Sequence, residues 1–213
     1  IDTIPIINDY IFICFLLGND FIPHLISLDL RHDGMSLIME SYVKVYEKYN
    51  TTIIDDKVIN MTILIEFIKL LSFNEDKTVQ ELFKKRQKRN KYFKLRNVET
   101  EYDKRMELLN NYPIIHMKKE LCITQDSMHT PDWRKRYYYY SLNMPYNKKT
   151  VHNICKNYID GLFWTFNYYI LGKTNWRWFY KYSIPPTLQD IVKALESYNK
   201  PVFKSDGPVE THI

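Results

Sequence analysis

Residues 10–17 read YIFICFLL and residues 18–25 read GNDFIPHL, so an unbroken apolar run leads directly into a turn. A helix without a polar face is normally buried, and we expect this run to lie inside a core that holds its last turn rigidly. Gly18 and Asn19 end the run, because both residue types tolerate the left-handed backbone of a helix end or a tight turn. The pattern therefore predicts that Asp20 is an acid held on a buried scaffold.

Two roles are open for the Asp20 carboxylate from the local pattern. It can cap the next helix by accepting hydrogen bonds from free backbone N–H groups, and the local pattern taken alone favours this role. It can also bind a hard metal ion, because such ions prefer anionic oxygen ligands that are held with little positional freedom.

The charge of the chain is unevenly distributed. The 213 residues, enough to bury a sizeable core, include 30 basic and 25 acidic side chains, which gives a net charge of +5. Eight cations fall within residues 84–96, and such a cluster attracts a polyanion by releasing its counterions. A solvated helix face is the alternative interpretation. The cluster consists of Lys84, Lys85, Arg86, Lys88, Arg89, Lys91, Lys94 and Arg96.

Cysteine and glycine usage limits the class of protein. Cys14, Cys122 and Cys155 show neither a zinc spacing nor a disulfide framework, so we expect reduced cysteines in an intracellular protein, in the cytoplasm rather than the nucleus. No apolar run approaches the length of a membrane span, and we expect no membrane partner. The five glycines form no phosphate-cradling motif, which argues against nucleoside triphosphate hydrolysis.

Apolar residues recur at three- and four-residue spacing along most of the chain, which predicts a mainly α-helical fold. We expect Asn60 to cap one helix and Thr187 with Asp190 to form a capping box for the last one. Gly172 is expected to end the longest apolar helix. The predicted helices cover residues 35–49, 60–71 and 75–95 and three further segments that begin near Thr130, Asn147 and Thr187, with loop at 110–129.

Three blocks of the sequence, in the same order along the chain, resemble the XRN family of 5′→3′ exoribonucleases. The first is Ile7–Leu30, around the family's Gly-Asn-Asp-Phe segment. The second is Asp132–Tyr138. The third is Tyr158–Trp164, which continues through residues 168–180 to Pro186. Because the three blocks span most of the chain, their combination is far more specific than any one of them.

The resemblance implies a mainly α, multi-helix domain that packs on an α/β nuclease domain of the flap-endonuclease type, absent from this sequence. Residues 1–30 would be the C-terminal end of the nuclease core, residues 31–198 the helical domain and residues 199–213 a frayed tail. In the family, the α/β domain carries most of the metal-binding carboxylates and a basic pocket for the RNA 5′-phosphate. We therefore expect an N-terminal nuclease segment of the same protein as a partner, and we expect this chain alone to be inactive.

The resemblance also places Asp20 at a catalytic aspartate of the family, as a ligand of Mg²⁺ or Mn²⁺. The implied reaction is metal-dependent hydrolysis of RNA that bears a 5′-monophosphate. A two-metal site needs several acids, so Asp20 would supply only one ligand. We expect Asn19 and His24 to lie behind this ligand, where Asn19 shapes the turn and His24 supports the site or serves the fold.

Single-stranded RNA is the polymer that the resemblance implies. Aromatic rings can stack on unpaired bases, although an aromatic residue on a helix is more often part of a core. Basic side chains can hold phosphates without reading the bases, with solvated surface charge as the alternative. The candidates are Trp164, Trp176 and Trp178 for bases, and Arg134, Arg136, Lys84, Lys85, Arg86, Lys88 and Arg89 for phosphates.

The sequence departs from the family at two places. Residues 181–186 read KYSIPP where related chains usually carry a Pro-x-His-Tyr-Ala-Pro stretch, and Ile26 replaces a common proline. These differences indicate a divergent member, and we expect a viral one. They also keep open a non-catalytic RNA-binding or scaffold module derived from such an enzyme. A helical domain whose basic helix binds an acidic protein partner is a third hypothesis.

Overall fold

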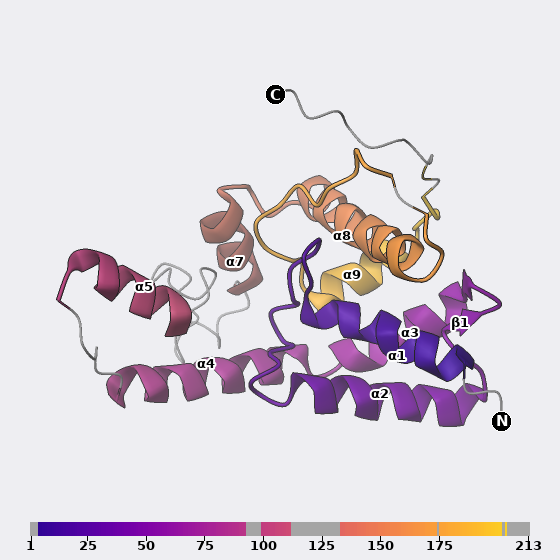
Figure 1. Ribbon diagram of the computed structural model, residues 1–213, viewed down its shortest axis with the longest axis horizontal. Helices are drawn as coiled ribbons and strands as arrows, with labels where there is room; N and C mark the ends of the chain where they lie inside the picture. The colour runs from indigo at the N-terminus through magenta and orange to yellow at the C-terminus, as the bar shows by residue number, and fades with distance from the viewer. Residues whose placement is uncertain (1–3, 93–98, 112–132, 174, 202, 204–213) are drawn as a thin grey trace. The chain divides into compact units, whose positions relative to one another are not determined.

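The computed structural model describes residues 4–92, 99–111, 133–173, 175–201 and 203, and helices dominate it (Figure 1). This confirms the mainly α fold class. Within these residues no helix is long and apolar enough to cross a membrane. The elements are α1 (Ile4–Cys14), the 3-10 helix η1 (Phe15–Leu17), α2 (Gly34–Tyr49), β1 (Ile54–Asp55), β2 (Val58–Ile59), α3 (Met61–Ser72), α4 (Glu75–Tyr92), α5 (Glu101–Asn111), α7 (Trp133–Leu142), α8 (Lys148–Tyr169) and α9 (Leu188–Leu195).

The chain divides into two compact units. The first contains Ile1–Glu75 and Lys148–Ile213, and the second contains Asp76–Asn147. The predicted boundary at residue 30 does not coincide with this division, because the Asp20 segment packs inside the first unit. The assignment of residues 1–30 to a nuclease core stays a prediction, and most of the predicted tail at 199–213 lies outside the described residues.

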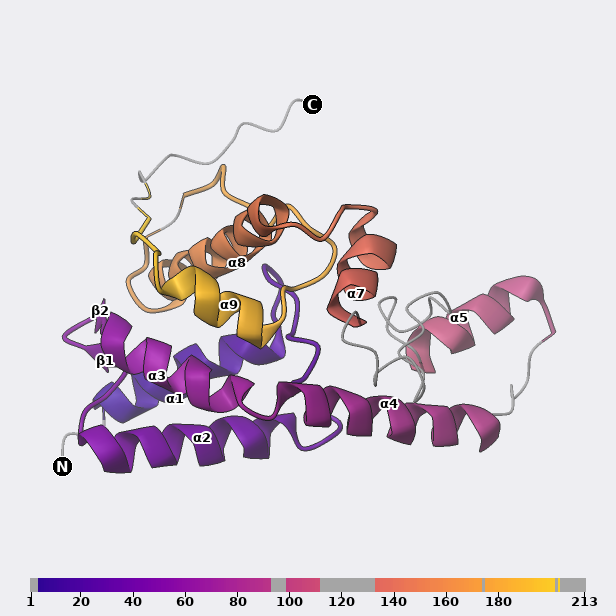
Figure 2. The ribbon, with the colours of Figure 1, turned by 180° about the vertical axis from the view of Figure 1, so that it is seen from behind.

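In the first unit, α3 packs against α2 and α9, and α8 packs against α9 (Figure 2). The faces that meet are those on which the sequence places apolar residues at helical spacing, and their burial is the main stabilising term of the unit. Fully or almost fully buried side chains include Phe12, Ile13, Ile38, Phe67, Ile154, Tyr158, Ile159 and Leu188.

A buried acid joins three elements of this core. Asp9 on α1 is inaccessible to solvent, and its Oδ2 accepts hydrogen bonds from the Tyr42 hydroxyl at 2.7 Å and the Ile53 amide at 2.8 Å. Its Oδ1 accepts a third bond from the Ile54 amide at 2.7 Å. Burial raises the pKa of Asp9, and these three donors oppose the rise. Asp9 thus holds α2 and the start of the β1–β2 hairpin against α1.

The expectation that residues 10–17 lie wholly inside a core is wrong for one face of α1. Phe12, Ile13, Phe15 and Leu16 are buried, but 45% of Tyr10 and 37% of Ile11 are exposed. Only one side of a helix faces the core here, although the sequence is apolar on every side. Apolar composition does not force burial, because a folded surface contains many apolar atoms.

The predicted helix ends are partly confirmed. Asn60 caps α3, since its Oδ1 accepts the amide hydrogens of Thr62 at 3.1 Å and Ile63 at 3.4 Å. Gly172 follows α8 in a left-handed conformation with φ +63°, as expected for a terminating glycine. The predicted helix at 75–95 is present as α4, with residues 93–95 outside the described ones.

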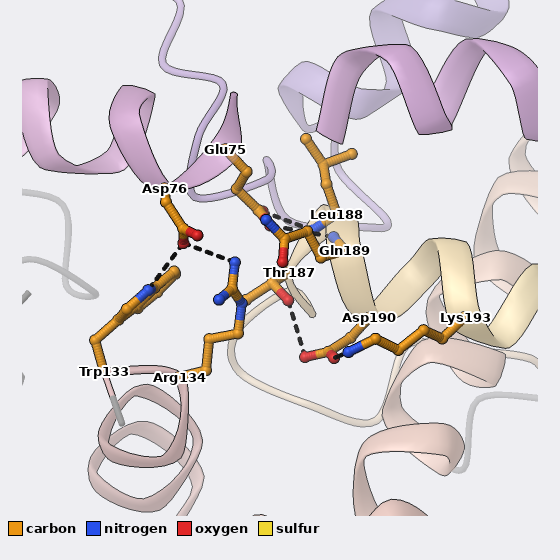
Figure 3. A network of polar contacts seen from close by, with 9 residues as sticks. All are labelled: Glu75, Asp76, Trp133, Arg134, Thr187, Leu188, Gln189, Asp190 and Lys193. Carbon is orange, nitrogen blue, oxygen red and sulfur yellow. Dashed lines mark hydrogen bonds and ion pairs between the residues drawn. The ribbon is translucent and has the colours of Figure 1, made fainter. Parts of the chain in front are cut away.

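The cap of α9 differs from the predicted capping box. The Thr187 hydroxyl donates to Asp190 Oδ2 at 2.9 Å, while the first two helix amides donate to a distant side chain (Figure 3). Leu188 N–H donates to Glu75 Oε1 at 2.6 Å and Gln189 N–H donates to Glu75 Oε2 at 3.1 Å. A carboxylate at a helix N-terminus also interacts favourably with the helix dipole. Glu75, which is 1% exposed and is the first residue of α4, therefore links the junction between α3 and α4 to α9.

In the second unit, Asp76 on α4 connects to α7. Its Oδ1 accepts hydrogen bonds from Trp133 Nε1 at 2.9 Å and Arg134 Nη2 at 2.7 Å (Figure 3). Trp133, Tyr137 and Tyr138 on α7 are buried. The predicted loop at 110–129 is wrong for its first two residues, Asn110 and Asn111, which end helix α5. The rest of this loop and the predicted helix start at residue 130 lie outside the described residues.

Candidate functional site

The loop that carries Asp20 leaves η1 through a strained turn. Gly18 has φ +90° and its N–H donates to Phe15 O at 3.0 Å. A Cβ atom at this position would lie 2.8 Å from the backbone nitrogen of His24, so only glycine fits both the backbone angle and the space. At the base of the loop, Leu25 N–H donates to Leu16 O at 3.1 Å.

Asn19 shapes the loop, as the sequence predicted. Its side-chain Oδ1 accepts the amide hydrogens of Phe21 at 2.9 Å and Ile22 at 3.0 Å, and its own N–H donates to Ile22 O at 3.0 Å. These three bonds close a turn around Asp20, because a short asparagine side chain can replace a backbone acceptor. The position of the Asp20 backbone is therefore defined by hydrogen bonds on both sides of it.

The Asp20 side chain is exposed at the tip of this loop. Among the described residues it forms no hydrogen bond or ion pair, so the capping role that the local pattern favoured is excluded. The next helix, α2, begins only at Gly34. The carboxylate is therefore available to bind a cation, which suits an oxygen ligand of a hard metal ion.

Asp20 does not belong to a complete metal site in this part of the molecule. In the described residues, no group of three or more His, Cys, Asp or Glu side chains is placed to hold an ion. Asp29 accepts the Arg31 amide and pairs with His32 at 3.0 Å, and Asp9 is buried in its own hydrogen bonds. A carboxylate on a hydrogen-bonded loop, outside any such group in the described residues, fits one ligand position of a shared ion.

His24 faces the protein rather than solvent alone. Its Nδ1 lies 3.1 Å from the carbonyl oxygen of Leu25, and the side chain is half-buried beside Gly18. This contact gives the imidazole a structural role at the base of the loop. The predicted support of a metal ligand by His24 stays a prediction.

The next residue, Phe21, inserts into a cluster of aromatic side chains from α8. Its ring centroid lies 4.7 Å from that of Trp164 and 5.1 Å from that of Tyr168, both in edge-to-face geometry. Such pairs add favourable energy beyond the apolar area that they bury. The residue that follows the candidate metal ligand is thus anchored on a helix about 140 positions later in the sequence, roughly the separation of Phe21 from Trp164.

Base stacking on Trp164 is contradicted by this cluster. The indole is 6% exposed, its ring is stacked between Tyr168 at 5.5 Å and Trp178 at 5.3 Å, and its Nε1 donates to Asn175 O at 2.8 Å. Because so little of the ring is exposed, Trp164 is a core residue. Trp178 is half-buried and gives one face to the same stack.

Open aromatic surface lies instead in the segment after α8. Trp176 is 54% exposed and Phe179, which sequence reasoning missed, is 65% exposed. Lys173, Arg177 and Lys181 in the same segment are also exposed, so cations alternate with aromatic rings there. The mixture of cations and aromatic residues in residues 173–181 is the sequence feature that could have indicated an exposed ring at Phe179.

The predicted phosphate ligands of the second unit divide into two groups. Arg134 is 16% exposed, bonds to Asp76 and lies with its guanidinium carbon 4.6 Å from the Trp133 ring centroid, so it serves the fold. Arg136 is also half-buried. By contrast, Lys84, Lys85 and Lys88 are exposed on α4, and their spacing places them on one side of the helix. The side chains of Arg86 and Arg89 lie outside the described ones.

Comparison with known proteins gives the relationship of the chain. The family model described as the Xrn1 helical domain matches residues 1–128 and 117–208. The 5′-3′ exoribonuclease 2 homolog of Drosophila melanogaster is 24% identical over 226 residues, which covers 87% of this chain and 24% of the fly protein. The 5′-3′ exoribonuclease 1 of Homo sapiens is 25% identical over 223 residues, which covers 89% of this chain and 13% of the human protein.

A shorter match is more similar. The 5′-3′ exoribonuclease 2 of Debaryomyces hansenii is 36% identical over 80 residues, or 38% of this chain and 8% of the yeast protein. The chain spans about a quarter or less of the length of these three relatives. Since the family model extends over almost all of the sequence, the resemblance drawn from the three blocks is confirmed, and the chain belongs to the Xrn1 helical domain family.

Proposed function

We propose that this chain is part of a 5′→3′ exoribonuclease, in which it supplies one metal-binding carboxylate and a helical scaffold. The observation that carries the proposal is the Asp20 side chain, which is exposed and has no partner among the described residues, on a loop with a hydrogen-bonded backbone. The names of the relatives, which are 5′-3′ exoribonucleases, support the reaction class. The substrate would be single-stranded RNA with a 5′-monophosphate.

The ion at this carboxylate would be Mg²⁺ or Mn²⁺, which prefer oxygen ligands. When bound, such an ion polarises a phosphoryl oxygen and lowers the pKa of a bound water. Asp20 contributes one anionic ligand with a defined position, and the turn bonds of Asn19 limit its movement. The remaining acids belong to an N-terminal nuclease segment, which this proposal includes as a partner.

Asp20→Asn tests the metal role in the gene product that carries this sequence. The amide keeps the shape of the side chain but removes the anionic ligand, and loss of several kcal/mol of transition-state stabilisation lowers kcat by roughly 100-fold or more. Degradation of 5′-monophosphate RNA is measured across a Mg²⁺ series. Asp55→Asn, an exposed acid on the β1–β2 hairpin, is the matched control. Equal activity of Asp20→Asn and wild type would refute the role.

The exposed lysines of α4 favour a second candidate function, a non-catalytic RNA-binding or scaffold module. Lys84, Lys85 and Lys88 present three charges on one helix side. If each contacts a phosphate, the logarithm of the RNA association constant falls with the logarithm of salt concentration with a slope of about −2. Replacing all three with glutamine removes this part of the slope. Binding without cleavage by wild-type protein in Mg²⁺ would favour the module over the enzyme.

Base stacking on the tryptophan segment, residues 173–181, is part of the same RNA-binding proposal. Trp176 has the exposed ring surface that an unpaired base needs, whereas Trp164 has none free. The cytoplasmic location and the viral origin that the sequence suggested stay predictions.

A further inference from the structure

Two consecutive residues after Asp20 are anchored on helix α8. Phe21 packs its ring against Trp164 and Tyr168, and Ile22 is 1% exposed. The turn that presents the carboxylate therefore rests on α8 as well as on η1. Any displacement of α8 side chains at this contact is transmitted to Asp20 through one or two backbone links.

Gly161 forms a notch in α8 at this contact. A Cβ atom built on Gly161 would lie 2.7 Å from Cγ2 of Ile22 and 2.9 Å from Cη2 of Trp178. Carbon atoms in favourable contact are about 3.5–4.0 Å apart, so both side chains occupy the space that any other residue at 161 would fill. Ile22 of the Asp20 loop and Trp178 of the tryptophan segment therefore both occupy the notch.

Helix preference does not explain a glycine at this position. Gly161 lies in the interior of α8, at Lys148–Tyr169, and glycine is the least favourable residue there after proline. Its φ is not in the left-handed region, where glycine has an advantage, since the positive-φ glycines described are Gly18 and Gly172. Close approach of other chain segments is the remaining physical reason.

We propose that Gly161 is a positioning residue that sets the place of the Asp20 carboxylate through Ile22 and couples it to Trp178. This inference rests on the proposed function only for its effect on catalysis, because the packing itself is independent of any reaction. A methyl group at 161 pushes Ile22 and Trp178 outward, which loosens the turn bonds between Asn19 and Ile22. The carboxylate then binds its ion less tightly.

The test compares Gly161→Ala with Gly172→Ala in the gene product that carries this sequence. Gly172→Ala is the control for the loss of a glycine without a steric clash: its φ of +63° strains an alanine, but nothing lies within 4 Å of a Cβ placed there. Amide hydrogen exchange is measured on peptides that cover residues 18–25. We expect at least fivefold faster exchange in Gly161→Ala and less than a twofold change in Gly172→Ala. Equal exchange in both variants and wild type would overturn the inference.

Ile22→Ala approaches the same contact from the loop side and adds no atom to α8. We expect at least fivefold faster exchange of residues 18–25 in this variant, and a smaller further effect of Gly161→Ala in its background, because the Cγ2 methyl is gone. Full additivity of the two substitutions would contradict the notch. This pair remains informative if Gly161→Ala alone does not fold.

Catalytic assays separate this inference from the proposed function. For Gly161→Ala, the Mg²⁺ concentration at half-maximal rate rises at least fivefold. A purely structural defect lowers the active fraction and leaves the Mg²⁺ dependence as in wild type, which would overturn the coupling to the carboxylate. If Asp20→Asn is fully active while loop exchange responds to Gly161→Ala, the proposed function fails and the anchoring of the loop stands.

Discussion

Replacing Asp9 with asparagine removes a buried acceptor on which three donors converge. The Asp9 carboxylate accepts the Tyr42 hydroxyl and the amides of Ile53 and Ile54 at 2.7–2.8 Å. Asparagine has only one side-chain oxygen and presents an NH₂ group in place of the other. If the oxygen faces Ile54, the Tyr42 hydroxyl can rotate to accept from the new NH₂, but the Ile53 N–H is left without an acceptor.

An unsatisfied buried N–H costs about 1–3 kcal/mol. We therefore expect Asp9→Asn to lower the free energy of unfolding by about 2 kcal/mol, which for a protein of this size lowers Tm by roughly 4–8 °C. Tyr42→Phe costs less, about 0.5–1.5 kcal/mol, because it removes one donor and leaves both amides paired. Asp9→Ala costs more than Asp9→Asn, since it leaves all three donors unpaired and opens a cavity.

The assay is urea and thermal unfolding followed by tryptophan fluorescence, which reports on Trp164 and Trp178 in the same unit as Asp9. Asp55→Asn is the control, because this carboxylate is exposed and its replacement changes the free energy of unfolding by no more than about 0.5 kcal/mol. If Asp9→Asn and Asp55→Asn are equally stable, or if Tyr42→Phe costs more than Asp9→Asn, the assigned hydrogen-bond accounting is wrong.

Three further outcomes follow from other contacts. Glu75→Gln weakens the cap of α9 and lowers the free energy of unfolding by about 1 kcal/mol in urea titrations, whereas an unchanged midpoint would contradict the cap. Burial raises the pKa of Tyr158 above its unfolded value near 10, so its contribution to stability is complete below about pH 10 and is lost as the pH rises further. We therefore expect Tyr158→Phe to lose less stability than wild type between roughly pH 9.5 and 11.5. Equal losses in the two proteins would contradict the raised pKa. If the exposed Trp176 ring stacks on a base, Trp176→Ala weakens single-stranded RNA binding by about 1–3 kcal/mol in fluorescence titrations. Tyr139→Ala, which replaces an exposed aromatic residue of α7, is the control. An equal effect of the two substitutions would argue against stacking.

Local signals were sufficient where the partners lie close in sequence. The Asn60 cap involves amides two and three residues away, and the Asn19 turn closes over the same distance. The terminating role of Gly172 depends only on its own backbone angle. The three sequence blocks likewise identified the family, because their order along the chain is a property of the sequence.

Local patterns did not predict contacts between residues that are far apart in the sequence. Residues 10–17 look uniformly apolar, yet only tertiary contacts select which face of α1 is buried. Trp164 resembles a base platform in sequence, but it is buried with its ring stacked on those of Tyr168 and Trp178. The cap of α9 comes from Glu75, 113 residues earlier, a pairing that no local pattern contains.

The amino-acid order alone established a helical member of the XRN family with an aspartate after a Gly-Asn turn, since helix periodicity, turn chemistry and motif order are local properties. It could not establish that Asp20 is exposed without a partner in the described part of the chain, or that its loop rests on a notch at Gly161. Those facts depend on which side chains, far apart in the sequence, come into contact in the folded protein. Close packing admits only one occupant there, and that competition is resolved when the helices assemble.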